Sequence, residues 1–193
     1  MNAKKCIVLD LDNTLWGGIV GEDGFNGIKL SLAGPGAGFV AFQQALLDLH
    51  NKGVILAINS RNNYEDAIRV IRTHPNMILR ENNFAAARIN WNDKASNLKE
   101  LAKEINIGLD SMVFLDDDPV NRALVKAILS EVETPEMPSN PSDYTKFLIG
   151  LPYFDLAALT DEDKMRGNFY TTERLRRESE KSFNNQKEFL KSL

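Results

Sequence analysis

Two aspartates that follow an apolar run are the strongest chemical signal in this sequence. The run is Cys6-Ile7-Val8-Leu9, which predicts a buried strand, and Asp10 and Asp12 come directly after it. Side chains two residues apart lie on the same face of an extended segment, so we expect both carboxylates to face one cavity. Close carboxylates repel each other unless a cation or a shared proton offsets their charge. The pair therefore predicts a divalent metal ion, a general acid, or both.

Further polar residues follow other predicted elements. In a parallel sheet the carboxyl ends of the strands share one edge, so residues at those ends are expected to meet. Acidic oxygens from two strands can hold one Mg²⁺, while a lysine and a hydroxyl can hold phosphate oxygens. One aspartate is then free to attack phosphorus, which predicts phosphoryl transfer. The candidates are Asn59, Ser60 and Arg61 after the second strand, Lys94 at a helix start, and Asp116 and Asp117 after a later strand.

Strand and helix patterns alternate along most of the chain. This order predicts an α/β, Rossmann-like fold with a mostly parallel five-stranded sheet and helices on both faces. Strands are expected at 5–11, 54–58, 77–79, 112–115 and around Val132, and helices before Gly53 and over 64–73, 95–105 and 120–128.

The C-terminal region has a different composition. Residues 135–152 are rich in Pro, Ser and Asn and are expected to be loop. Thr160 and Asp163 have the spacing of a capping box that begins a last helix. Residues 171–193 mix both charge signs with few large apolar residues, which fits either a solvated terminal helix or a linker from a longer protein.

Size and composition limit the possible functions. A chain of 193 residues can form one substantial core, and we expect a catalytic domain over 1–160 with a helical extension over 161–193. The net charge of −4 argues against a nucleic-acid partner. The single cysteine, Cys6, excludes an internal disulfide and favours a reducing, cytoplasmic setting. The apolar stretch Val54–Ile58 is too short to span a membrane.

The ordered motifs resemble those of the haloacid dehalogenase-like phosphatases. The matching residues are Asp10-x-Asp12-x-Thr14, Ser60, Lys94 and Asp116-Asp117. Longer strings are similar to the FkbH-like branch, also called subfamily IIIC, and the resemblance covers roughly residues 5–170. These strings are Asp10-Leu-Asp-Asn-Thr-Leu-Trp-Gly-Gly18 with Gly21-Glu-Asp-Gly24, Leu115-Asp-Asp-Asp-Pro119 with Arg122, and Thr160-x-Glu162-Asp163-x-x-Arg166-x-x-x-Tyr170.

The resemblance implies a role for each matching residue. Asp10 would be the nucleophile that forms an aspartyl-phosphate, and Asp12 would protonate the leaving oxygen and then deprotonate water. Thr14 would orient the loop. Ser60 and Lys94 would bind the phosphoryl group, with Asn59 and Arg61 assigned to the same set. Mg²⁺ would bind Asp10, the backbone carbonyl of Asp12, and Asp116 or Asp117.

The resemblance also implies a substrate class. FkbH-type enzymes dephosphorylate a glyceryl unit and load it on an acyl carrier protein, and they usually carry Cys-Ser-Lys-Asn at the second motif. This chain has Asn59-Ser60-Arg61-Asn62 there, so the thiol before Ser60 is absent, and Cys6 is expected to be buried.

The spacing of the motifs bears on the size of the partner. The segment between Ser60 and Lys94 leaves no room for a cap domain, so the site is expected to be open to a phosphoryl group on a large partner such as a carrier. The alternative is a non-hydrolytic module that docks a carrier or binds a phosphoryl group. Trp16 and Trp91 are interpreted as packing residues, with Trp16 at the border of the site.

Overall fold

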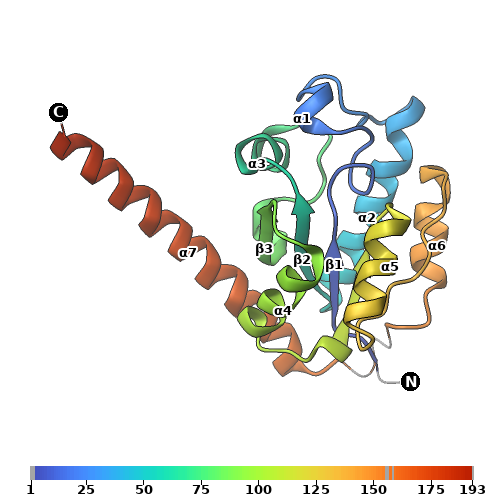
Figure 1. Ribbon diagram of the computed structural model, residues 1–193. Coiled ribbons are helices and arrows are strands. Elements are labelled where there is room, and N and C mark those ends of the chain that lie inside the picture. The colour runs from blue at the N-terminus through green and yellow to red at the C-terminus, as the bar shows by residue number, and fades with distance from the viewer. Residues whose placement is uncertain (1–2, 155–156, 158, 193) are drawn as a thin grey trace.

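The domain is built on one parallel sheet. The computed structural model describes residues 3–154, 157 and 159–192. Four strands in these residues form a sheet in the order β3-β2-β1-β4, and every neighbouring pair is parallel (Figure 1). Strands with both faces covered need apolar side chains on both faces, which explains the uninterrupted apolar runs of β1 and β4. The strands are β1 (Cys6–Leu9), β2 (Ile55–Arg61), β3 (Phe84–Asn90) and β4 (Met112–Leu115).

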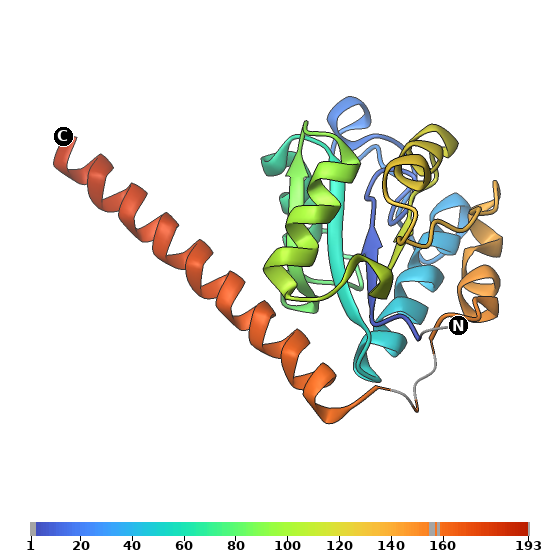
Figure 2. The same cartoon turned by 60° about the horizontal axis from the view of Figure 1, so that its bottom comes forward.

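Helices cover both faces of this sheet, as the two views of the ribbon show (Figures 1 and 2). Ile7 and Leu9 of β1 pack in one core cluster, whereas Cys6 and Val8 pack in another. This alternation places the first cluster against α2 (Ala37–Asn51), α3 (Tyr64–Thr73) and α6 (Tyr144–Gly150). The second cluster packs against α4 (Lys94–Ile105) and α5 (Pro119–Ile128). A short helix, α1 (Val20–Asp23), lies in the loop after β1.

The last helix, α7 (Asp161–Ser192), begins against the domain and then leaves it. Its predicted capping box is confirmed, because Asp163 Oδ2 accepts from the Thr160 backbone and hydroxyl while Asp163 N donates to Thr160 Oγ1. Arg174, only 7% exposed, donates to the carbonyl of Phe84 on the edge strand β3. Beyond this contact the helix projects away from the domain (Figures 1 and 2).

The predicted strand at 77–79 is wrong. Met77 and Leu79 are buried, but the backbone N–H groups of Ile78 and Leu79 donate to Gln43 Oε1 rather than to a strand. The third strand is instead the Ala-rich segment Phe84–Asn90, whose small residues give a weak strand signal.

Two other predictions need correction. The expected fifth strand, around Val132, is reduced to a single parallel bridge between Val113 and Glu133, so the sheet of the described residues has four strands. The region 135–152, predicted to be loop, contains α6, because Tyr144 and Leu148 lie four residues apart and both pack into the core.

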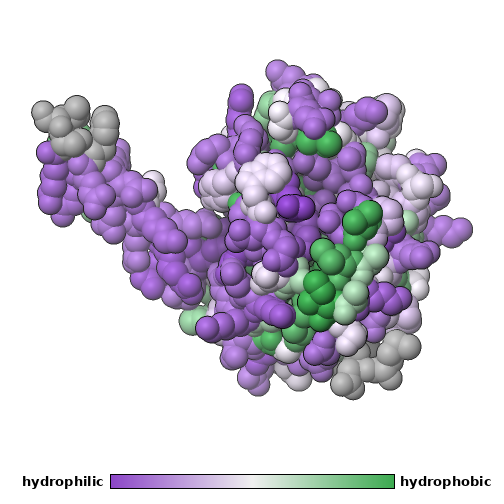
Figure 3. Space-filling model, in the orientation of Figure 1, coloured by the Kyte–Doolittle hydropathy of each residue, from purple (hydrophilic) through white to green (hydrophobic). Residues whose placement is uncertain are grey.

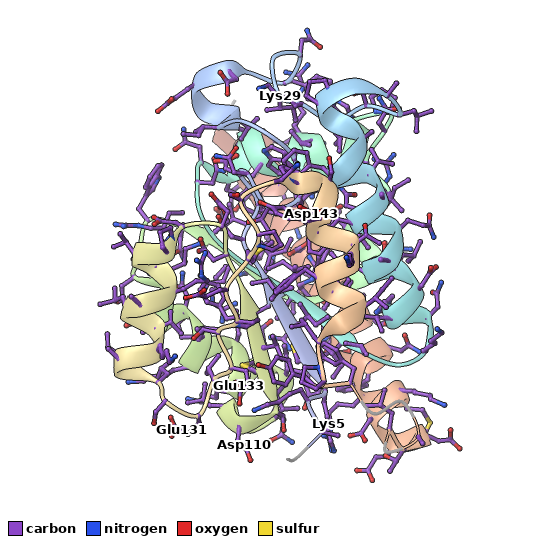
Figure 4. The ribbon with its side chains drawn as sticks, turned by 90° about the vertical axis from the view of Figure 1, so that its right-hand side faces the viewer. Lys5, Lys29, Asp110, Glu131, Glu133 and Asp143 are labelled. Carbon is purple, nitrogen blue, oxygen red and sulfur yellow. The ribbon has the colours of Figure 1, made fainter. Side chains whose placement is uncertain are left out.

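The two ends of the sheet differ in the residues that they gather. Figure 4 shows Lys5, Asp110, Glu131 and Glu133 together at the amino end of the strands, far from Lys29 on the loop after β1. At this end Lys4 Nζ donates to the Asp110 carbonyl, 2.6 Å away. The predicted catalytic residues lie at the opposite, carboxyl end of the strands.

Candidate active site

A buried lysine lies at the centre of the carboxyl edge of the sheet. Lys94, 2% exposed, reaches from the first turn of α4. Its Nζ lies 2.8 Å from Asp10 Oδ1 and 3.1 Å from Asp116 Oδ2. Because β1 and β4 are neighbours, the residues that follow them bring these two carboxylates together. The predicted convergence of Asp10, Asp116 and Lys94 is therefore observed.

Three carboxylates at this edge can hold a metal ion. One carboxylate oxygen from each of Asp10, Asp116 and Asp117 lies within 4.8 Å of the others. Burial and repulsion from Asp10 raise the pKa of Asp116, and the same causes, with repulsion from Asp116, raise the pKa of Asp117 to about 7. The single positive charge of Lys94 offsets only part of the negative charge that three ionised carboxylates would carry. Clustered carboxylate oxygens are hard ligands, so the group fits a cation such as Mg²⁺.

The loop that carries Asp116 and Asp117 is held from several sides. The Thr14 hydroxyl donates to Asp117 Oδ1 at 3.3 Å. Arg122 Nη1 donates to the carbonyls of Asp116 and Asp117 at 2.7 Å, and Asn121 Nδ2 donates to Asp116 Oδ2 at 3.2 Å. These contacts bind Arg122 and Asn121 to the cluster, and only Arg122 had been marked in the sequence, as part of a motif.

The carboxylate of Asp12 lies apart from this cluster and is not one of the three grouped side chains. Its Oδ1 accepts from Trp16 Nε1 at 2.8 Å and from the Val20 backbone N–H at 3.0 Å, and its Oδ2 accepts from Asn62 Nδ2 at 2.8 Å. Burial raises the pKa of Asp12, although these hydrogen bonds and Lys94 act in the opposite direction. A raised pKa favours the protonated form that a general acid needs. The contact between Mg²⁺ and the Asp12 backbone carbonyl, which the resemblance implies, stays a prediction.

A network of neutral amides supports the lysine. The Asn59 side chain is fully buried; it donates to the Lys94 carbonyl at 3.0 Å and accepts from Asn97 Nδ2 at 3.1 Å. Asn97 Nδ2 also donates to Asn90 Oδ1 at the end of β3, 2.9 Å away. Asn59 was expected to bind phosphate, but its side-chain amide is engaged with protein groups and positions Lys94. Asn97 and Asn90 carried no motif and were not predicted.

Ser60 and Arg61 continue the same strand end. Ser60 is 1% exposed, whereas Arg61 is exposed at the last position of β2.

The two tryptophans also differ in exposure. Trp16 is fully buried, as predicted, but Trp91 is 63% exposed, so its interpretation as a packing residue is wrong. Trp91 follows the last residue of β3 and therefore lies beyond the layer that the helices cover.

Comparisons with known proteins agree with this architecture. No family model matches the chain, and no curated protein sequence matches it. Among solved structures, the N-terminal part of the protein BF1531 from Bacteroides fragilis, described as containing a phosphatase domain and complexed with Mg, is 41% identical with a TM-score of 0.79. The match covers 82% of this chain and 42% of that one, so the chain spans less than half of the BF1531 structure.

A second structure shows the fold alone. The HAD domain of the effector protein Lem4 from Legionella pneumophila is 16% identical with a TM-score of 0.52, and the match covers 82% of this chain and 99% of that one. The fold is thus that of haloacid dehalogenase-like domains. Among the described helices, none is both long and apolar enough to cross a membrane.

Proposed function

We propose that this haloacid dehalogenase-like domain is a Mg²⁺-dependent phosphohydrolase or phosphotransferase that works through an aspartyl-phosphate on Asp10. The observation that carries the proposal is the division of the carboxylates. Asp10 lies with Asp116, Asp117 and a buried lysine, whereas Asp12 is held apart with a raised pKa. The phosphatase domain and the Mg of the BF1531 structure support the same chemistry.

The chain's own residues account for both half-reactions. A carboxylate oxygen of Asp10 attacks phosphorus while the bond between phosphorus and the leaving oxygen breaks, and Asp12 gives its proton to that oxygen. Asp12, now ionised, takes a proton from water as the water oxygen attacks the aspartyl-phosphate, which frees phosphate and restores Asp10. Lys94 holds Asp10 and stabilises phosphoryl oxygens. Mg²⁺ held by Asp10, Asp116 and Asp117 would offset the repulsion between Asp10 and the phosphoryl group.

We further propose, from the FkbH-like motif resemblance, that the substrate is a three-carbon glyceryl unit or another acyl or sugar phosphate unit carried by an acyl carrier protein. A thioester on this domain has no suitable thiol, because Asn59 occupies the usual cysteine position. The single cysteine, Cys6, is fully buried, and burial raises the pKa of its thiol. An acceptor thiol therefore has to come from outside this domain.

An exposed apolar strip on α5 supports a protein partner. Val120, Leu124 and Ile128 are 71%, 45% and 51% exposed, whereas Val125 of the same helix is buried against the sheet. The strip begins directly after the Asp116–Asp118 loop, and Figure 3 shows it as a green band over α5. A protein seated there would lie beside the active site, and exposed Lys126 favours an acidic one. The strip consists of Val120, Ala123, Leu124, Ala127 and Ile128.

The strip can be tested separately from the chemistry. In the double variant L124S/I128S we expect turnover of a carrier-bound phosphate to fall at least tenfold in kcat/KM, while turnover of a free aryl phosphate stays within twofold. The measurement is phosphate release from both substrates. Equal loss on both substrates, or no loss on either, would contradict the docking role.

The chemistry is tested with Asp10→Asn. We expect Mg²⁺-dependent phosphate release from an aryl phosphate to fall on the order of a thousand-fold or more, about 4 kcal/mol of barrier. Mass spectrometry of acid-quenched wild type should find one phosphoryl group on the peptide that contains Asp10. The matched control is Asp161→Asn, whose side chain is 94% exposed, and it should leave the rate unchanged.

Two outcomes would contradict the mechanism. Turnover near the wild-type rate in Asp10→Asn would exclude the aspartyl-phosphate. No turnover by folded wild type that binds Mg²⁺, with aryl phosphates and with carrier-bound phosphates, would favour the non-hydrolytic binding module instead.

A further inference from the structure

Trp91 is the large aromatic side chain that the mechanism leaves unused at the rim of the active site. Its indole is 63% exposed, yet its Nε1 donates to Asn63 Oδ1 at 3.3 Å. An indole whose polar tip is anchored while its ring is exposed is typical of recognition surfaces.

Hydrogen bonds fix both the group that binds the Trp91 indole and the backbone that carries it. Asn63 Nδ2 donates to Asp66 Oδ2 at 3.2 Å, which fixes the amide that receives the indole N–H. The backbone around Trp91 is fixed by Asn90, whose Oδ1 accepts from the Asn92 backbone N–H at 3.1 Å and from Asn97 Nδ2 at 2.9 Å. The Trp91 side chain is therefore already ordered, and it loses little conformational entropy when a ligand packs on the indole.

A chain of hydrogen bonds connects Trp91 to Asp12, the proposed acid for the leaving group. Asn62 Nδ2 donates to Asp12 Oδ2 at 2.8 Å, and Asn62 Oδ1 accepts from the Asn63 backbone N–H at 3.0 Å. Trp91 is thus linked through Asn63 and Asn62 to the residue that protonates the leaving oxygen. The group that departs with that oxygen lies on this side of the site, because its proton comes from Asp12.

The neighbouring strand end adds a cation. Arg61 pairs in register with Asn90, the residue before Trp91, and is exposed. Among the described residues no carboxylate lies within ion-pair distance of its guanidinium. The rim next to Trp91 thus carries the positive charge of Arg61, which forms no ion pair with any described residue.

We propose that Trp91 forms a subsite for the leaving group, where the indole packs against the face of a ring. The inference rests on the proposed function and deepens it: among the units considered above, it selects a phosphate ester of a ring-bearing alcohol over an acyclic three-carbon unit. An aryl ring and the C–H face of a sugar ring can both pack on an indole, and a sugar phosphate is the ring-bearing unit among the substrates proposed above.

The test compares substrates that differ in the leaving group. Wild type, Trp91→Ala and Trp91→Phe are assayed with phenyl phosphate, a hexose phosphate and glycerol phosphate. We expect Trp91→Ala to lower the ratio of kcat/KM for the ring-bearing substrates to that for glycerol phosphate by about five- to tenfold. Trp91→Phe should restore most of the ratio. Phe169→Ala, which removes an aromatic ring 58% exposed on α7, is the matched control and should leave the ratio unchanged.

A binding experiment separates this inference from the chemistry. In Asp10→Asn, titration with the hexose phosphate should change the tryptophan emission, titration with glycerol phosphate should not, and adding Trp91→Phe should abolish the change. The other tryptophan, Trp16, is fully buried. A ratio unchanged in Trp91→Ala, with Asp10-dependent turnover intact, would overturn the subsite alone. Loss of Asp10 dependence would overturn the proposed function. A response to phenyl phosphate without one to the hexose phosphate would exclude the sugar.

Discussion

The two halves of the sheet's carboxyl edge are held together by different interactions. The half formed by β1 and β4 gathers ionisable groups, with Lys94 2.8 Å from Asp10 and Asp117 raised in pKa to about 7. The half formed by β2 and β3 is held by amides, because Asn97 of α4 donates to Asn59 Oδ1 on β2 and to Asn90 Oδ1 on β3. Charges that repel can be reorganised by a cation or a proton, whereas satisfied neutral amides hold one arrangement. The first half is thus suited to chemistry and the second to fixed positioning.

Lys94 contacts both halves, because its ammonium pairs with Asp10 and Asp116 and also donates to the Asn59 carbonyl at 2.7 Å. Its removal should have the largest effect on stability. In Lys94→Met, Asp10 and Asp116 lose their buried cation, so we expect the free energy of unfolding without Mg²⁺ at pH 7 to fall by about 3–5 kcal/mol. Urea unfolding measures the change. Mg²⁺ should restore part of it, because the metal would supply the missing positive charge.

Lys99→Met is the matched control for this variant. Lys99 lies on the same helix and is exposed, so the same substitution there should change the unfolding free energy by less than about 0.5 kcal/mol. If Lys94→Met were as stable as Lys99→Met, the charged half of the edge would not depend on its cation, and the contrast between the halves would fail.

The amide half can be tested at Asn97. Asn97→Ala leaves Asn59 Oδ1 without its donor and removes one of the two donors to Asn90 Oδ1, which should cost about 1–3 kcal/mol of unfolding free energy. The loss should not depend on Mg²⁺ or on pH between 5.5 and 7.5, since amides do not titrate. Exposed Asn92 offers the control Asn92→Ala, which should be near neutral. An effect of Asn97→Ala that Mg²⁺ abolishes would show that the two halves are not independent.

The charged half could be predicted from the sequence because it depends on topology alone. Parallel strand ends share an edge, and this places Asp10 beside Asp116 and lets Lys94 reach both. The predicted order of strands and helices was therefore enough to bring Asp10, Asp116 and Lys94 together.

The amide half could not be predicted, because it depends on where β3 lies. Met77 and Leu79 have a strand-like apolar spacing, but their segment is held by a buried glutamine instead. With β3 shifted to Phe84–Asn90, Asn90 and Trp91 reach the site, and no local pattern marks either residue. The register shift between Leu56 and Ala57 in the β2–β3 pairing is likewise a tertiary feature.

The smallest expected effect is the pH dependence of Mg²⁺ binding, which should arise from the charged half alone. Asp117 has a pKa of about 7 without metal, against an ordinary value near 4 for aspartate. Between these values the unfolded carboxyl is ionised while the folded one keeps its proton, so unfolding releases a proton and metal-free stability falls as the pH rises. Mg²⁺ needs the ionised form, so its apparent affinity should rise about tenfold per pH unit below pH 7 and level off above it.

Calorimetric titration with Mg²⁺ at pH 5.5, 6.5 and 7.5 checks this prediction. Asp117→Asn should weaken binding and flatten the dependence, although a residual slope from Asp116 is expected because burial and Asp10 raise its pKa as well. Asn97→Ala should keep the wild-type slope, since the amides next to Lys94 carry no titrating group. An affinity that stays flat from pH 5.5 to 7.5 in wild type would mean that neither Asp116 nor Asp117 holds a proton in this range, and the charged half would then resemble the amide half in holding one fixed state.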